Sequence, residues 1–83
     1  VLNLTPPQVH STIAMDTLNA GKHAYSEKPF GVDFDDAAKV IALAKEKGLR
    51  VGCAPDTFLG GGQQTARKLI DDGWIGKPLS GFP

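Results

Sequence analysis

The sequence contains only one cysteine, Cys53, so a disulfide framework is excluded, and this side chain is best explained as a small buried apolar residue. An excess of either charge is also lacking, because nine basic and nine acidic residues give a net charge of zero. This balance gives no electrostatic reason to expect binding to nucleic acid or to an anionic membrane surface. No apolar run approaches the roughly 20 residues of a membrane-spanning helix, and no signal-peptide pattern precedes the first predicted element. We therefore expect a soluble cytoplasmic protein.

Two further absences narrow the kinds of site that the chain can hold. His23 opens a predicted strand and has no partner at metal-ligand spacing, so we interpret it as structural and expect no metal site. Three consecutive glycines, Gly60 to Gly62, are not followed by the GK[ST] sequence of a phosphate-binding loop. We interpret them as a hinge between two domains, with substrate contact as the other reading.

The chain alternates short apolar strands with amphipathic helices. Strands are predicted at residues 1–5, 23–26 and 49–54, and helices at residues 7–20, 33–47 and 63–72. Asp33 has the position of an N-cap, and Gly21, Gly48 and Gly73 have the positions of C-terminal caps. This order with short links predicts an α/β fold: a partial doubly wound, Rossmann-type sheet of parallel strands joined by right-handed crossovers, followed by a short helix.

The apolar pattern also predicts how several side chains pack. Three small residues in the third strand, Gly52, Cys53 and Ala54, indicate that another group approaches this strand closely. Asp35 and Lys39 are expected to pair on the solvent side of the second helix. Trp74 and Ile75 are large apolar residues, and we expect them to anchor a core. The core-facing positions of the second helix are predicted to be Phe34, Ala37, Ala38, Ile41 and Ala44, with Val40 beside them.

The predicted topology has two consequences. Thr5, Glu27 and Asp56 all follow carboxyl ends of parallel strands, so they are expected at one edge of the sheet, where ligands bind in such folds. Both helices are expected on the same face, although parallel strands normally need both faces buried. The missing half of a doubly wound domain, the last helix folding back, or a second copy of the chain would each cover the other face. We expect a fragment of a longer protein or a chain that needs a partner.

The segment Glu27-Lys28-Pro29 leaves the second strand at this edge. It places a carboxylate, an ammonium group and a proline in consecutive positions, and the proline makes the turn stiff. Both isomers of the Lys28–Pro29 bond are open, and cis bonds make up about 5–6% of X–Pro bonds in folded proteins. The residues alone leave two readings, which are a solvated turn with two surface charges and a ligand-binding turn.

Four sequence motifs resemble the Gfo/Idh/MocA family of NAD(P)-dependent oxidoreductases, which act on sugars and polyols. The motifs are TPP at residues 5–7 with His10, AGKH at residues 20–23, EKPFG at residues 27–31, and the run APDTFLGGGQQTARKLIDDGWIGKP at residues 54–78. They cover nearly all of the chain. The resemblance implies that residues 1–58 are the C-terminal half of a dinucleotide-binding Rossmann domain. Residues 59–83 would then be a linker, a helix and the start of the catalytic domain.

The resemblance also implies roles for individual residues toward NAD or NADP. Lys28 would reach the nicotinamide and the reacting hydroxyl and act as the catalytic acid–base group, while the hydride chemistry belongs to the cofactor. Glu27 would hold a ribose or orient the lysine, and His10 would lie near the cofactor. The positions that correspond to the family's cofactor-binding residues are Thr5, Pro6, Pro7, His10, Glu27, Lys28 and Pro29.

The chain departs from the family pattern in what it lacks. The glycine-rich phosphate loop and the acidic residue that would hold the adenosine ribose are absent, so we expect the isolated chain to bind cofactor weakly and to be inactive. The leading interpretation is a fragment of a sugar or polyol dehydrogenase that works on a small-molecule substrate as a homo-oligomer. The alternatives are a sugar- or cofactor-sensing regulator that has lost the chemistry, and a self-associating structural module.

Overall fold

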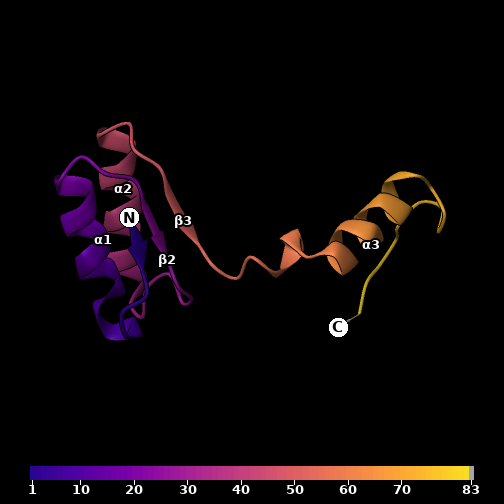
Figure 1. Ribbon diagram of the computed structural model, residues 1–83, viewed down its shortest axis with the longest axis horizontal. Helices are drawn as coiled ribbons and strands as arrows, with labels where there is room; N and C mark the ends of the chain where they lie inside the picture. Colours follow the sequence, from indigo (N-terminus) through magenta and orange to yellow (C-terminus); the bar gives the residue numbers. More distant parts are fainter. Residues whose placement is uncertain (83) are drawn as a thin grey trace.

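The computed structural model describes residues 1–82, and it contains a small parallel sheet with two helices packed on it and a third helix set apart (Figure 1). The elements in chain order are β1 (Leu2–Asn3), η1 (Pro7–Val9), α1 (His10–Asn19), β2 (Ala24–Ser26), α2 (Phe34–Glu46), β3 (Val51–Cys53), η2 (Thr57–Leu59) and α3 (Gly61–Asp71).

The sheet has the strand order β1-β2-β3, and both neighbouring pairs are parallel. One row of the register joins Leu2, Tyr25 and Gly52, and the next row joins Asn3, Ser26 and Cys53. Because side chains alternate between the faces of a strand, the two rows point to opposite sides of the sheet. The α/β prediction with parallel strands is confirmed.

Helices α1 and α2 pack against each other on one face of the sheet, as predicted (Figure 1). The buried apolar residues come from both helices and from β2, and they are Ala14, Leu18, Ala24, Val40 and Ala44. Together they form a thin layer between the helices and the sheet. Small side chains let the helices approach the strands closely.

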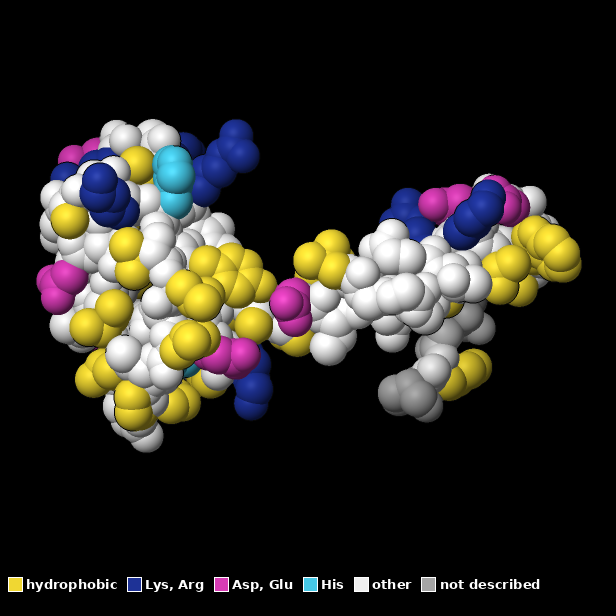
Figure 2. Space-filling view, in the orientation of Figure 1, with side chains coloured by type: hydrophobic (Ala, Val, Ile, Leu, Met, Phe, Trp, Pro, Cys, Tyr) yellow, Lys and Arg dark blue, Asp and Glu magenta, His cyan; other side chains and the backbone are white. Residues whose placement is uncertain are grey.

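The opposite face of the sheet has no covering element among residues 1–82. Leu2 is 61% exposed and Tyr25 is 37% exposed, and Figure 2 shows hydrophobic side chains gathered over the strands. Gly52 is covered by the ring of Tyr25, since a Cβ built on this glycine would lie 2.7 Å from Tyr25 Cδ2. The close approach predicted at Gly52 is therefore confirmed, and the approaching group comes from the neighbouring strand.

The ends of the helices confirm the predicted caps. The Asp33 carboxylate accepts hydrogen bonds from the backbone N–H groups of Asp35 and Asp36, at 2.9 and 3.1 Å. Gly21 and Gly48 follow the C-terminal ends of α1 and α2 with φ of 73° and 63°, in the left-handed region that favours glycine.

The predicted core face of α2 is partly wrong. Val40 and Ala44 are buried, but Phe34 is 86% exposed and Ile41 is also exposed. The apolar residues of α2 cover more of its circumference than α1 and the sheet can bury, and the packing selects Val40 and Ala44. Lys39 pairs with Asp36 at 2.8 Å rather than with Asp35, so this ion pair has i,i+3 spacing.

Helix α3 differs most from the sequence predictions. It begins at Gly61 rather than at Gln63, so two of the three glycines are helical and Gly60 alone precedes it in extended conformation. The helix lies away from the sheet (Figure 1) and contains no buried residue. Trp74 is 76% exposed and Ile75 is exposed as well, so the core-anchor prediction is wrong.

Candidate functional site

The predicted site residues lie in two turns that leave adjacent strands at the same edge of the sheet. The first turn, Thr5 to Pro7, follows β1, and the second, Glu27 to Pro29, follows β2. Because β1 and β2 are parallel neighbours, both turns emerge at their carboxyl ends. This is the edge at which open α/β sheets bind ligands.

The first turn is shaped by its two prolines. Pro6 is extended, with φ −60° and ψ 148°, and Pro7 opens the short helix η1. Proline is well suited to a first helical position, where its missing N–H leaves no donor unpaired. The Thr5 hydroxyl donates to Asn3 Oδ1 at 2.6 Å, and the Thr5 carbonyl points to His10 Nε2 at 2.8 Å.

The second turn presents the lysine. The Glu27 N–H donates to the Asn3 carbonyl at 2.9 Å, which extends the β1–β2 ladder to the base of the turn. The Glu27 carboxylate accepts from the Lys28 backbone N–H at 2.7 Å. The Lys28–Pro29 bond is cis, and the Phe30 side chain packs against the apolar core. Within residues 1–82, the exposed Lys28 ammonium group makes no ion pair or hydrogen bond, so it is available to a ligand.

The third strand contributes less than predicted. Cys53 Sγ lies 3.8 Å from the Glu27 carbonyl oxygen, so the tip of β3 borders the second turn. Burial, and to a smaller extent the negative charge of Glu27, raises the pKa of the Cys53 thiol. This favours the thiol over the nucleophilic thiolate. Asp56 is exposed beyond the cis Ala54–Pro55 bond, and its carboxylate contacts neither Glu27 nor Lys28 in the described part of the chain.

Asn3 was not identified as a site residue from the sequence, yet it lies directly beneath both turns. It is 2% exposed. Its amide nitrogen donates to the His10 carbonyl at 3.1 Å and to the Ser26 hydroxyl at 3.3 Å, and its amide oxygen accepts from both the N–H and the hydroxyl of Thr5. The feature of the sequence that could have identified Asn3 is its polar amide side chain within an otherwise apolar predicted strand.

His10 is also buried, at 1% exposure. Its Nδ1 lies 2.7 Å from the Pro29 carbonyl oxygen, and its Nε2 lies 2.8 Å from the Thr5 carbonyl oxygen. The structure thus brings the seven predicted cofactor-binding residues together at one edge of the sheet. It places His10 beneath the turns rather than on their surface.

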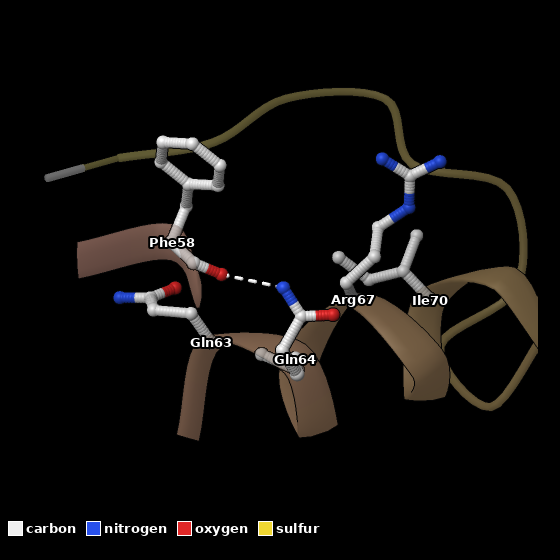
Figure 3. A pocket seen from close by; sticks show the side chains of 6 residues that line it. Phe58, Gln63, Gln64, Arg67 and Ile70 are labelled. Atoms are coloured by element: carbon white, nitrogen blue, oxygen red, sulfur yellow. Dashed lines mark hydrogen bonds between the residues drawn. The ribbon is translucent and has the colours of Figure 1, made fainter. Parts of the chain in front are cut away.

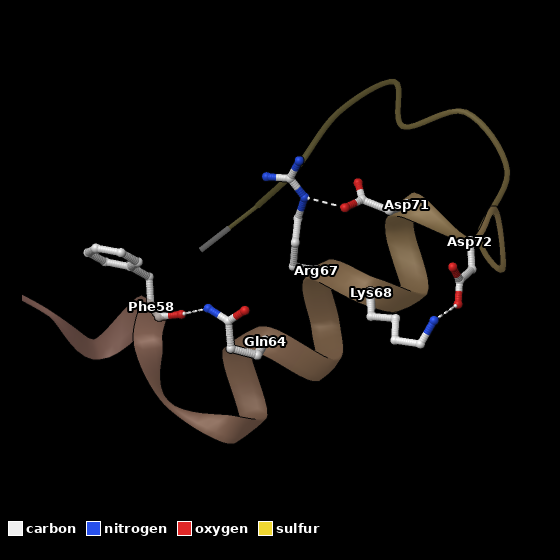
Figure 4. A network of polar contacts seen from close by, with 6 residues as sticks. All are labelled: Phe58, Gln64, Arg67, Lys68, Asp71 and Asp72. Atoms are coloured by element: carbon white, nitrogen blue, oxygen red, sulfur yellow. Dashed lines mark hydrogen bonds and ion pairs between the residues drawn. The ribbon is translucent and has the colours of Figure 1, made fainter.

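The two hollows that stand out on the described surface lie elsewhere. One, of about 330 Å³, is bounded by Phe58 and the exposed side of α3 (Figure 3). Its polar contacts are local, since Gln64 donates to the Phe58 carbonyl and two i,i+4 ion pairs, Arg67–Asp71 and Lys68–Asp72, follow on the same helix (Figure 4). The other, of about 300 Å³, lies on the uncovered sheet face. Residues 1–82 contain no cluster of potential metal ligands.

No helix in the described chain combines the length and the apolar character needed to cross a bilayer.

Residues 1–54 match a protein family described as an oxidoreductase family with an NAD-binding Rossmann fold. The chain is 39% identical over 72 residues to the uncharacterized oxidoreductase C115.03 of Schizosaccharomyces pombe, a match that covers 87% of this chain and 20% of that protein. It is 37% identical over 79 residues to an inositol 2-dehydrogenase/D-chiro-inositol 3-dehydrogenase of Lactiplantibacillus plantarum, with coverage of 87% and 21%.

The fold is also found in solved structures. Apo scyllo-inositol dehydrogenase from Lactobacillus casei aligns with a TM-score of 0.85 at 28% identity, over 93% of this chain and 23% of that one. The chain therefore spans about one fifth of the length of the proteins that it matches.

Proposed function

Because the chain belongs to the Gfo/Idh/MocA family of oxidoreductases, we propose that it forms part of the cofactor-binding domain of an enzyme that transfers hydride between a sugar or polyol hydroxyl and a nicotinamide cofactor. Relatives that carry the names of inositol and xylose dehydrogenases support this substrate class. The complete protein would contain the first half of the Rossmann domain before this segment and a substrate domain after it.

The observation that carries the proposal is the placement of Lys28. Its backbone N–H is held by the Glu27 carboxylate, the following Phe30 is packed into the core, and its ammonium group has no partner among residues 1–82. The neighbouring turn lies at the same edge, since Asn3 bonds to the backbone of Glu27 and to the side chain of Thr5. A lysine at this edge with a fixed backbone and an unpaired side chain is well placed to act on a ligand.

The residues at the edge fit the nicotinamide-ribose end of such a cofactor. The Glu27 carboxylate uses Oε2 to accept from Lys28 N–H, which leaves its other oxygen free to accept from a ribose hydroxyl. Pro6 and Pro7 offer flat apolar surface beside it. The described residues do not fit the diphosphate, because the glycines that open α3 lie away from this edge (Figure 1). We therefore propose that residues 1–58 hold only one end of the cofactor, and that the isolated chain is inactive.

The chemistry assigned to this chain is a proton transfer. When an alcohol is oxidised to a carbonyl, the C–H bond supplies a hydride and the O–H bond supplies a proton. When bound, the nicotinamide cofactor would supply the hydride acceptor. Lys28, as a neutral amine, takes the hydroxyl proton, and as an ammonium group it returns the proton in the reverse direction. Glu27 holds the backbone of the lysine and orients it toward the edge.

The uncovered face of the sheet supports the assignment to a larger assembly. A parallel sheet normally has both faces covered, and here Leu2 and Tyr25 remain exposed. We propose that the first half of the Rossmann domain covers this face. A second copy of the chain is the alternative cover, and it corresponds to a self-associating module.

Replacement of the lysine tests the proposed function. In the complete protein, Lys28→Ala is expected to lower kcat about 10²–10⁴-fold, the range for losing a general acid–base group, while the Kd for NAD(H) changes only a few-fold. The matched control is Lys22→Ala, because Lys22 is exposed before β2, at the other end of the strand. Unchanged turnover of the Lys28 variant would show that the catalytic assignment is wrong.

A further inference from the structure

His10 is the first residue of α1, a position that is often exposed, but here its side chain is buried between two backbone carbonyl groups. It is 1% exposed, and both of its ring nitrogens face backbone carbonyl oxygens, with Nδ1 2.7 Å from Pro29 and Nε2 2.8 Å from Thr5. Both distances are at the short end of the range for N–H···O hydrogen bonds. A ring that is buried and engaged in this way does not reach a ligand at the edge.

The two carbonyl groups belong to the two turns of the candidate site. The last backbone bond between the first two strands runs from Glu27 N–H to the Asn3 carbonyl. Beyond this point in residues 1–82, the turn after β1 and the turn after β2 are joined through the ring of His10, whose two nitrogens lie within hydrogen-bond distance of one carbonyl oxygen in each turn. Without the ring, the two turns would be linked at their bases only.

We propose that His10 is a positioning residue that ties the Thr5 turn to the Pro29 turn, and so fixes the width of the edge that receives the nicotinamide end of the cofactor. The inference rests on the proposed function for what is bound, but the tie itself is a property of the fold. His10 acts through Thr5 and Lys28 and does not touch the reacting atoms.

A hydrogen bond to its backbone also holds His10 in place. The amide of Asn3 donates to the His10 backbone carbonyl at 3.1 Å, so the residue is held at its backbone as well as at its ring. A histidine ring that carries both protons donates to both carbonyl groups, whereas a neutral ring donates to one. In either form, the ring donates to at least one of the two turns.

The test compares His10→Phe, which keeps a ring of similar size but removes both ring nitrogens, with His23→Phe in the complete protein. His23 is a matched control, because it is the other histidine of the chain, is exposed, and bonds through Nδ1 to the Arg50 N–H at the opposite end of the sheet. In His10→Phe, amide hydrogen exchange is expected to accelerate about tenfold or more at Thr5 and Lys28, while the Ala54 amide, which bonds to Ser26, stays unchanged.

Cofactor binding is measured by calorimetry on the same proteins. The Kd for NADH is expected to rise about tenfold in His10→Phe, which corresponds to about 1.4 kcal/mol, and to stay within about twofold in His23→Phe. If exchange at Thr5 and Lys28 is unchanged in His10→Phe, the tie does not exist and the inference is overturned. If exchange accelerates but the Kd for NADH stays at the wild-type value, the tie does not position the cofactor, which also overturns it.

Two further measurements keep the inference testable if His10→Phe does not fold. His10→Gln retains one donor and is expected to give intermediate exchange rates. In the wild-type protein, nuclear magnetic resonance should detect a His10 ring N–H proton protected from solvent exchange, and a rapidly exchanging ring would overturn the inference. A wild-type protein that binds no NADH would contradict the proposed function, while the exchange rates would still decide whether the tie exists.

Discussion

Replacing Asn3 by leucine removes the polar centre of the strand edge and keeps the same number and branching of side-chain heavy atoms. Asn3 is 2% exposed. Its side chain takes part in four hydrogen bonds, of which the bond from the Thr5 hydroxyl at 2.6 Å and the bond to the His10 carbonyl at 3.1 Å are the stronger. The other two, to the Ser26 hydroxyl and from the Thr5 N–H, are both 3.3 Å long. Leucine can form none of them.

The expected cost follows from what the substitution leaves behind. Each of the two shorter bonds contributes about 1 kcal/mol net, and a buried polar group left without a partner costs about 1–3 kcal/mol more. Ser26 is 1% exposed, so its hydroxyl loses a partner without gaining water, whereas the half-buried Thr5 can be solvated again. We therefore expect Asn3→Leu to lower the free energy of unfolding by about 3–5 kcal/mol, a large part of the roughly 5–15 kcal/mol of a typical domain.

The assay is equilibrium urea unfolding followed by far-ultraviolet circular dichroism. The midpoint is expected to fall while the slope stays constant, which is the signature of a loss of stability without a change in the surface exposed on unfolding. The matched control is Asn19→Leu, since Asn19 is the other asparagine of the chain and is exposed at the end of α1. It should stay within about 0.5 kcal/mol of wild type. An Asn3→Leu variant that does the same would refute the view that this network holds the edge.

Two other predictions concern the third strand. Gly52→Val places a Cβ 2.7 Å from Tyr25 Cδ2 and should destabilise the protein by about 1–3 kcal/mol through overpacking. Thermal unfolding measures this loss. The control is Gly61→Ala, whose added Cβ meets nothing within 4 Å and which should be neutral or stabilising. Because burial and then Glu27 raise the pKa of Cys53, less thiolate is present at mildly alkaline pH, so iodoacetamide should alkylate Cys53 more slowly than a free thiol. Glu27→Gln should speed the reaction modestly, and alkylation faster than that of the free thiol would contradict the assigned environment.

The parts of the fold that were predictable from sequence are those set by local chemistry. Gly73, like the caps of the first two helices, has a positive φ, 79°, because a left-handed C-terminal residue favours glycine wherever the helix lies. Asp33 caps α2 through its own carboxylate. The parallel order followed from the alternation of strands and helices with short links. None of these features depends on what the rest of the molecule does.

The wrong predictions concern side chains whose burial depends on a partner far away in the sequence. Phe34 and Trp74 are large apolar residues at positions that a pattern assigns to a core, yet both are exposed. Apolar periodicity states which face of a helix can be buried, but not whether a second surface is present to bury it.

The candidate site shows why its visible residues were predictable and its supporting residues were not. Lys28 and Glu27 follow a strand directly, so topology alone places them at the edge. Asn3 and His10 serve the same edge from beneath, and their importance comes from backbone groups that a sequence pattern does not display. In the described chain, no buried polar side-chain atom lacks a hydrogen-bond partner. A fully paired network of this kind specifies one arrangement, and here the contacts of Asn3 and His10 hold the backbone of both turns from beneath.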